Sequence, residues 1–112
     1  MKLWQKYIHE RLGGKCLESE HAFITFAEHK NDGIIIILDA FVDPDYRGEM
    51  RGMHLYFGLE RYAVEHKFTE IQGTLHLDAP EFVRILRLAL NQNYKVVKAH
   101  NNAIHVSKKV GV

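Results

Sequence analysis

The sequence predicts an α+β domain in which helices flank a mixed, mostly antiparallel sheet. Residues 21–29, HAFITFAEH, alternate between two faces, as a strand does. Residues 34–42 are apolar on both faces, which is typical of a central strand covered on each side. A helical stripe over residues 52–63 separates this run from another alternating segment, residues 69–77. A strand–helix–strand unit makes its two strands parallel, so the sheet is predicted to be mixed.

The first half of the chain carries further start and stop signals. Apolar side chains recur at helical spacing over residues 2–12 until a Gly-Gly pair ends the pattern, which predicts an N-terminal helix. Residues 30–33, KNDG, predict a hairpin turn, because Asp-Gly tolerates the positive φ that a type I′ turn requires. The strand over residues 34–42 ends before Pro44, since proline cannot donate to the ladder.

The second half continues with a helix and a hairpin. Residues 78–81, DAPE, combine an aspartate cap, an early proline and a glutamate three residues after the cap, which predicts a helix start. The helix that follows turns its apolar side chains inward. Residues 96–99 and 104–106 predict a closing hairpin across the asparagine pair at 101–102, because asparagine accepts left-handed backbone geometry.

Composition restricts the classes of function. The 112 residues make a single domain, residues 1–112, with an ordinary 46% of hydrophobic and 26% of charged residues. A net charge of +1 and the lack of a basic stripe disfavour nucleic acid and anionic membranes as partners. The lone Cys16 excludes an internal disulfide, no secretory signal is present, and the longest apolar run is too short to span a bilayer. We therefore expect a cytoplasmic protein.

The turn after the apolar strand is the strongest functional signal. Residues 42–52 read VDPDYRGEMRG and lead from a strand directly into a helix. Such a turn points backbone N–H groups and the positive end of the helix dipole at one spot, a geometry that binds phosphate. Arg47 and Arg51 add side-chain charge. The alternative is an ordinary strand-to-helix connection with solvated arginines.

The run VDPDYRG, residues 42–48, resembles the acetyl-CoA-binding signature of the GCN5-related N-acetyltransferases, the GNAT family. In that signature an Arg or Gln is followed by two residues, a glycine, one residue, and then Gly or Ala. The order of elements over residues 34–106 is similar as well. The resemblance implies a GNAT-like acyl-CoA N-acyltransferase fold and acetyl-CoA as co-substrate, with the backbone of Phe41 and Val42 pairing with the pantetheine arm. By the same resemblance, the turn that cradles the pyrophosphate contains Arg47, Gly48, Met50, Arg51 and Gly52.

Several positions depart from the family pattern. Met50 stands where the family has its middle glycine, and a side chain there hinders close approach between backbone and phosphate. Glu49 places a negative charge beside the presumed pyrophosphate, while Arg51 offers a guanidinium–phosphate bond in place of lost amide contacts. Ala89 stands where many members carry the tyrosine that protonates the departing thiolate. Tyr94, a few residues later, is interpreted as a core residue.

A general base for the incoming amine is expected on the central strand or its neighbour. Asp39 is the acid within the apolar strand, and a carboxylate there is costly unless it is partnered or functional. Its alternative is a strand-edge charge facing solvent, and we weigh the two equally. Glu28 and His29 are weaker candidates. The eight histidines show no i, i+4 pair and there is no cysteine pair, so no metal site is predicted.

Two hypotheses follow for the function. The first is an acetyl-CoA-dependent N-acetyltransferase, in which a primary amine attacks the thioester directly and Asp39 or a water that it holds takes the proton. The second is a degenerate GNAT-like binding module that acts through protein–protein contact, of the small divergent kind found in phage genomes; Met50, Glu49 and Ala89 favour it. The short chain covers the sheet faces poorly, which is compatible with a homodimer across the terminal strands. The acceptor stays open between a small amine, a peptide N-terminus and a lysine.

Overall fold

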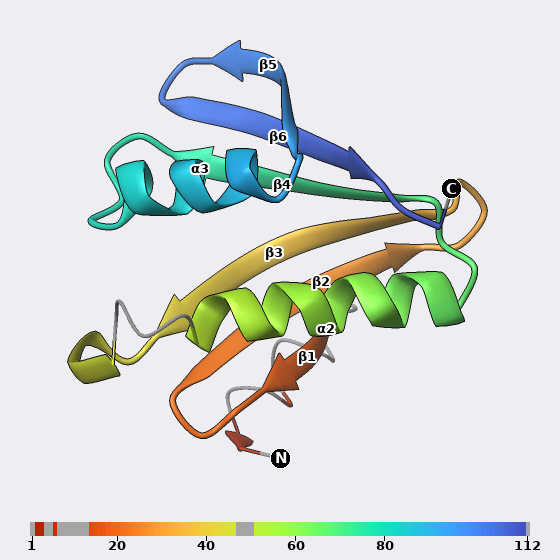
Figure 1. Cartoon of the computed structure of the whole chain (residues 1–112), viewed down its shortest axis with the longest axis horizontal. Coiled ribbons are helices and arrows are strands. Elements are labelled where there is room, and N and C mark those ends of the chain that lie inside the picture. Colours follow the sequence, from red (N-terminus) through yellow and green to blue (C-terminus); the bar gives the residue numbers. More distant parts are fainter. Residues whose placement is uncertain (1, 4–5, 7–13, 47–50, 112) are drawn as a thin grey trace.

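The computed structural model describes residues 2–3, 6, 14–46 and 51–111, with only the backbone described at residues 51–53. The elements run in the order β1 (Gly14–Glu18), β2 (Ala22–His29), β3 (Ile34–Val42), the 3₁₀ turn η1 (Pro44–Tyr46), α2 (Arg51–Glu65), β4 (Glu70–His76), α3 (Phe82–Asn91), β5 (Lys95–His100) and β6 (Ala103–Lys109) (Figure 1). The helix expected over residues 2–12 falls mostly outside the described residues.

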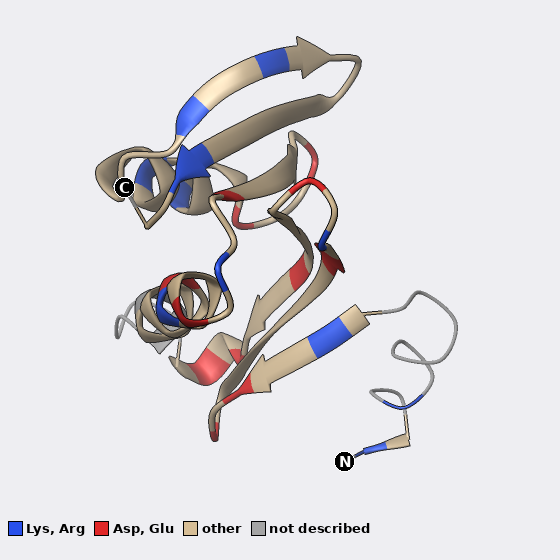
Figure 2. Cartoon of the chain, turned by 90° about the vertical axis from the view of Figure 1, so that its right-hand side faces the viewer, with Lys and Arg blue, Asp and Glu red and all other residues tan. Residues whose placement is uncertain are grey.

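The strands form one six-stranded sheet in the order β1-β2-β3-β4-β6-β5. Every neighbouring pair is antiparallel except β3 and β4, which the crossover through α2 makes parallel. Both α2 and α3 lie on the same side of this sheet (Figure 2). The predicted α+β class and the mixed, mostly antiparallel sheet are therefore confirmed.

The core lies between α2 and the middle of the sheet. Leu59 and Ala63 are fully buried one turn apart on α2, which is the apolar stripe that the sequence predicts. They meet side chains from three strands that are equally inaccessible: Ile24 and Phe26 of β2, Ile35 of β3 and Ile71 of β4. Each such side chain contributes about 1.5–3 kcal/mol by its removal from water, so this cluster holds the helix on the sheet.

Both predicted hairpins form. Gly33 closes the β2–β3 hairpin at φ +70°, but the φ of Asp32 is not positive, so the turn is not the type I′ turn that Asp-Gly predicted. Asn101 takes φ +52° between β5 and β6, as expected. β3 ends at Val42 just before Pro44, and the chain then curls through η1 with the Tyr46 N–H donating to the Asp43 carbonyl at 2.8 Å. These conformations need only neighbouring residues, and so sequence can identify them.

The elements differ from those expected in three places. β1 was not expected; it is a five-residue edge strand with a lysine and a glutamate among its residues, too short and polar to give an alternating pattern. α3 begins at Phe82 rather than at residues 78–81, which form a turn in which the Ala79 N–H donates to the His76 carbonyl. β3 was expected to be covered on both faces, but Leu38 and Phe41 in its second half are 42% and 45% exposed.

Candidate active site

The parallel strands β3 and β4 part soon after they meet. Their described pairing joins residues 34–36 of β3 to residues 70–72 of β4, whereas β3 runs on to Val42 and β4 to His76. Beyond this pairing each strand stays with its antiparallel neighbour, β2 or β6, so the sheet opens between them (Figure 1). Past Ile36, β3 therefore has no described ladder partner on β4.

A bulge in β3 accompanies the parting. Thr25 of β2 lies opposite Asp39, and the next residue, Phe26, lies opposite Ile37, so Leu38 is the extra residue. A bulge bends its strand and increases the local twist. The bulge lies in the part of β3 beyond its described pairing with β4, so the bend falls where the sheet opens.

The bulge also decides which side chains face the helices. Ile35 and Ile37 face α2 before the bulge, and Ala40 packs against the same core after it. Without the extra residue, the strict alternation of a strand would place Asp39 on that face instead. Asp39 is exposed, and its Oδ1 accepts the N–H of Ala40 at 2.8 Å. The structure thus places this carboxylate at the solvent side of the opening, the alternative that the sequence left open.

A cavity of about 40 Å³ lies at the opening, on the helix side of the sheet. Its walls come from both parting strands and both helices, among them Ile37 of β3, Gly73 of β4, Tyr56 of α2 and Ala89 of α3. A cavity needs about 10–15 Å³ to hold one water, so this one has room for a group of two or three heavy atoms. The absence of a side chain at Gly73 and the small one at Ala89 keep it open.

Tyr94 brings an unpaired hydroxyl to this cavity. The residue follows α3, is 4% exposed and lines the cavity, so the expectation that it belongs to the core is confirmed. Within the described ranges, its Oη has no hydrogen-bond partner. A buried hydroxyl without a partner costs about 1–3 kcal/mol, and such groups in native proteins call for an explanation. A ligand in the cavity would supply the missing acceptor.

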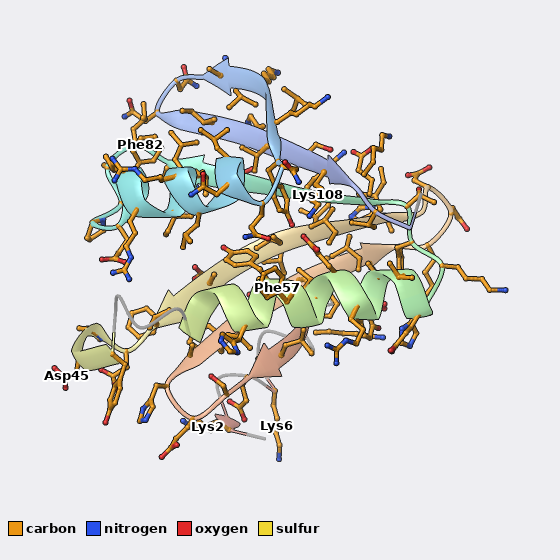
Figure 3. The ribbon with its side chains drawn as sticks, in the orientation of Figure 1. Lys2, Lys6, Asp45, Phe57, Phe82 and Lys108 are labelled. Atoms are coloured by element: carbon orange, nitrogen blue, oxygen red, sulfur yellow. The ribbon has the colours of Figure 1, made fainter. Side chains whose placement is uncertain are left out.

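The surroundings of Tyr94 keep its hydroxyl protonated. Burial raises its pKa well above the ordinary value for tyrosine, and the charge of Glu60 and the proximity of Tyr56 raise it further. Glu60 is itself held by Lys108 of β6, which Figure 3 labels. The Lys108 Nζ lies 2.6 Å from Oε1 of Glu60 and 5.8 Å from the Tyr94 ring centroid. This ion pair fixes α2 to β6 beside the cavity.

Tyr56 is a second protonated hydroxyl at the cavity. Burial raises its pKa to about 12, and the negative charge of Asp39 acts in the same direction. From the sequence Tyr56 was interpreted as a core residue, and no sequence motif indicated that it would line a cavity. Its place at the cavity is a tertiary feature, because the ring reaches the cavity only where α2 crosses the parting strands.

The predicted cofactor positions are divided between described and undescribed residues. Phe41 and Val42 lie on β3 beyond its pairing with β4, and the Phe41 ring stacks on Phe23 with centroids 5.9 Å apart. Arg47, Gly48 and Met50 lie outside the described residues. Arg51 and Gly52 form the first turn of α2, so the chain does pass from β3 into a helix as the motif requires.

The approach to that turn is held by its contacts with His21, the residue just before β2. The Asp43 N–H donates to the His21 carbonyl at 2.8 Å, and the Tyr46 ring stacks on the His21 ring with centroids 3.5 Å apart. The chain therefore leaves β3 in a defined position immediately before the predicted pyrophosphate residues.

The weaker candidates for a base are not brought to the opening. Glu28 bonds to Lys15 and Tyr62, near the point where β3 begins, and His29 follows it at the end of β2. Among the residues that the structure describes, no three His, Cys, Asp or Glu side chains gather as metal ligands. None of the described helices combines the length and the apolar character needed to cross a membrane.

The fold and the opening define a class of protein. No protein-family model and no curated protein matches the chain, but solved structures do match its fold. The ribosomal-protein-S18-alanine N-acetyltransferase from Escherichia coli superposes with a TM-score of 0.76 at 13% identity, over 96% of this chain and 77% of that one. The IAA acetyltransferase from Bacillus cereus ATCC 14579 gives 0.73 at 12% identity, over 95% and 85%.

A third match was solved with a ligand. The PaiA N-acetyltransferase from Thermoplasma acidophilum, in complex with coenzyme A, gives a TM-score of 0.70 at 16% identity, over 80% of this chain. The matched part is 53% of that longer protein, so the chain spans about half of its length. The chain thus has the GNAT acyl-CoA N-acyltransferase fold, as its sequence motif predicts.

Proposed function

We propose that the protein is an acetyl-CoA-dependent N-acetyltransferase in which a primary amine attacks the thioester directly. The observation that carries the proposal is the cavity where β3 and β4 part, together with the unpaired Tyr94 hydroxyl that lines it. The fold supports it, as does the resemblance of residues 42–48 to the acetyl-CoA signature. The coenzyme A complex of one structural neighbour supports the choice of co-substrate.

The residues present fit such a co-substrate. The cavity has room for a two-carbon acyl group, and its walls are largely apolar, as suits a thioester. Backbone groups of Phe41 and Val42 would pair with the pantetheine arm, and residues 47–52 would hold the pyrophosphate. Acetyl-CoA, when bound, supplies the activated acyl group.

The side chains at the opening then take distinct parts. Tyr94 donates a hydrogen bond from Oη into the cavity, where negative charge develops on the acyl oxygen or sulfur, and its buried position keeps the proton on the hydroxyl. Tyr56 closes the cavity as a second neutral hydroxyl. Asp39, exposed at the bulge, accepts the proton of the amine directly or through water. Tyr94 and Tyr56 thus offer the cavity hydroxyl donors, which Ala89, at the family's usual tyrosine position, does not have.

Thermal unfolding with acetyl-CoA tests the proposal. A ligand that binds the folded state alone raises the unfolding midpoint, so acetyl-CoA should raise it for the natural chain. Gly73→Val should lose this rise, because its methyl groups project from the cavity wall, where a Cβ would already lie 3.7 Å from Ile37 and Val106. Gly58→Ala, on α2 with its nearest contact 4.0 Å away, is the matched control and should keep the rise.

The outcomes separate binding from catalysis. If acetyl-CoA raises the midpoint of neither the natural chain nor the control, the proposal is wrong. If it binds and Arg47→Ala abolishes binding, the turn is the pyrophosphate site. Release of free thiol in the presence of peptide or small-molecule amines would establish transfer. Binding without thiol release on any amine would leave a cofactor-binding module.

A binding module acting through protein contact is the second candidate function. The observation in its favour is the outer surface near α3, where Val83 is 63% exposed and Leu90 49% exposed. Val97, on the edge strand β5, is 63% exposed as well. A chain that neither binds acetyl-CoA nor releases thiol would support this candidate. The homodimer across the terminal strands stays a prediction.

A further inference from the structure

A second cavity, of about 250 Å³, lies where α2 ends, and it shares no lining residue with the cavity at the strand opening. It is formed by β1, the end of β2 and the C-terminal end of α2. The 15 residues of α2 span about 22 Å at 1.5 Å per residue, so this cavity lies roughly that far from the predicted pyrophosphate turn. It is a separate site, and four of its lining residues are basic: Lys15, Lys30, His66 and Lys67.

The carboxylate in this cavity is already satisfied. Glu28 has a side chain that is 7% exposed, with Oε1 2.7 Å from Lys15 Nζ. The Tyr62 hydroxyl donates to Oε2 at 2.5 Å and accepts from Lys15 Nζ at 3.1 Å. Burial alone would raise the pKa of Glu28, but the bonds from Lys15 and Tyr62 outweigh it and the pKa is lowered. The negative charge is therefore matched by Lys15.

Two further lysines line the cavity without a carboxylate partner among the described residues. Lys30 and Lys67 line the same cavity and are exposed, and in the described part of the chain neither forms an ion pair with a carboxylate. The charge of Lys30 also helps to lower the pKa of Glu28. Three lysines and one glutamate line the cavity, which leaves an excess of two positive charges. Positive charges that line one cavity repel each other, and an anion bound there would offset this repulsion.

The backbone at Lys67 adds an independent observation. Lys67 has φ +64°, and the Phe68 N–H donates to the Ala63 carbonyl at 2.8 Å while the Lys67 N–H donates to Val64 at 3.1 Å. This is a Schellman ending of α2, whose left-handed position glycine fills with least strain. A lysine there places a long cationic side chain at the cavity in spite of that strain. Such outliers are a reason to look for a function.

The remaining walls restrict the ligand. Tyr62 and His66 stack with ring centroids 4.0 Å apart and form a flat wall beside Phe68. His66 Nδ1 lies 2.9 Å from the Tyr62 carbonyl, and because a carbonyl only accepts, Nδ1 carries the proton and Nε2 is left for another partner. Pockets for drug-sized ligands are about 300–1,000 Å³, so 250 Å³ suits a smaller molecule.

We propose that this cavity binds a small metabolite through an oxyanion, either a phosphate or a carboxylate group, held between Lys30 and Lys67. The flat wall of Tyr62 and His66 contacts the body of the ligand. The site is independent of acetyl-CoA binding and of any transfer reaction.

Thermal unfolding with simple anions tests this site. Low-millimolar inorganic phosphate and low-millimolar succinate, compared with chloride at equal ionic strength, distinguish the two anion sources. We expect at least one of them to raise the midpoint by about 4 °C or more. Lys30→Gln with Lys67→Gln should abolish the rise and weaken binding at least tenfold. Lys95→Gln with Lys98→Gln removes the same charge from exposed positions on β5 and should keep it.

Amide NMR locates the bound anion. The largest shifts on titration should fall on residues 28–30 and 66–68 rather than on the first turn of α2. Equal rises of the midpoint in the two double variants would show a general salt effect rather than binding at this cavity, and would overturn the proposal. A response that disappears with Arg47→Ala would overturn it as well, since the anion would then occupy the predicted pyrophosphate turn. The absence of any response to either anion would also overturn it.

Discussion

Removal of one oxygen from Tyr94 should stabilise the protein. The hydroxyl is buried without a partner among the described residues, and the ring around it is 4% exposed. Tyr94→Phe keeps the ring and removes a group whose desolvation costs about 1–3 kcal/mol. With an unfolding entropy of about 2.1 cal/mol/K per residue, 1 kcal/mol corresponds to about 4 °C for a chain of this length. The unfolding midpoint should therefore rise by about 4–12 °C.

Calorimetry or circular dichroism without ligand measures this change, and Tyr62→Phe is the matched control. Its hydroxyl donates to Glu28 and accepts from Lys15, so the same substitution there should lower stability by about 1–2 kcal/mol. The opposite signs separate an unpaired hydroxyl from a paired one. A midpoint for Tyr94→Phe that stays equal or falls would refute the reasoning. If the hydroxyl serves an acyl ligand, the stabilised variant should also release thiol more slowly.

Three further perturbations test the electrostatics and the core. The pKa of Tyr56 is raised from 10.0 to about 12, so its contribution to stability is complete below pH 10 and is lost as the pH rises toward 12. The loss is about 2.7 kcal/mol at most. In urea titrations at alkaline pH, Tyr56→Phe should therefore lose less stability than the natural chain. The pKa of Glu28 is lowered from 4.5, so its contribution to stability is complete above pH 4.5 and is lost as the pH falls below that value. The free energy of unfolding of Glu28→Gln should therefore fall less steeply in acid than that of the natural chain. An equal dependence on pH would contradict the Lys15 bond. Leu59→Ala opens a cavity at a fully buried site and should cost about 2–5 kcal/mol by denaturant titration, whereas Leu3→Ala, 83% exposed, should cost little.

The sequence motif and the tertiary opening support one another at the level of the fold. The VDPDYRG run indicated a strand that feeds a helix beside a ligand, and β3, η1 and α2 follow in that order. Most of the pyrophosphate residues lie outside the described part of the chain, so their role stays a prediction. The cavity that we propose for the acyl group is described, and the hydroxyls that line it belong to Tyr94 and Tyr56, whereas position 89 is an alanine.

Local chemistry alone determined the hairpins, the end of β3 and the apolar stripe of α2. Gly33 can adopt positive φ because it lacks a Cβ, and Asn101 because its short polar side chain tolerates the left-handed region. Pro44 ends a strand whatever surrounds it. Alternation and helical spacing operate over a few residues, so they can be read directly along the chain.

Only the tertiary structure decided the bulge at Leu38, the parting of β3 from β4 and the isolation of the Tyr94 hydroxyl. Each depends on groups distant in sequence: the register of β3 is set against β2, and the cavity joins residues from Ile37 to Val106. Whether a buried hydroxyl finds a hydrogen-bond partner depends on every element packed around it, so no local sequence pattern can predict it. For the same reason the cavity at the end of α2, assembled from β1, β2 and the helix terminus, became visible only in the folded chain.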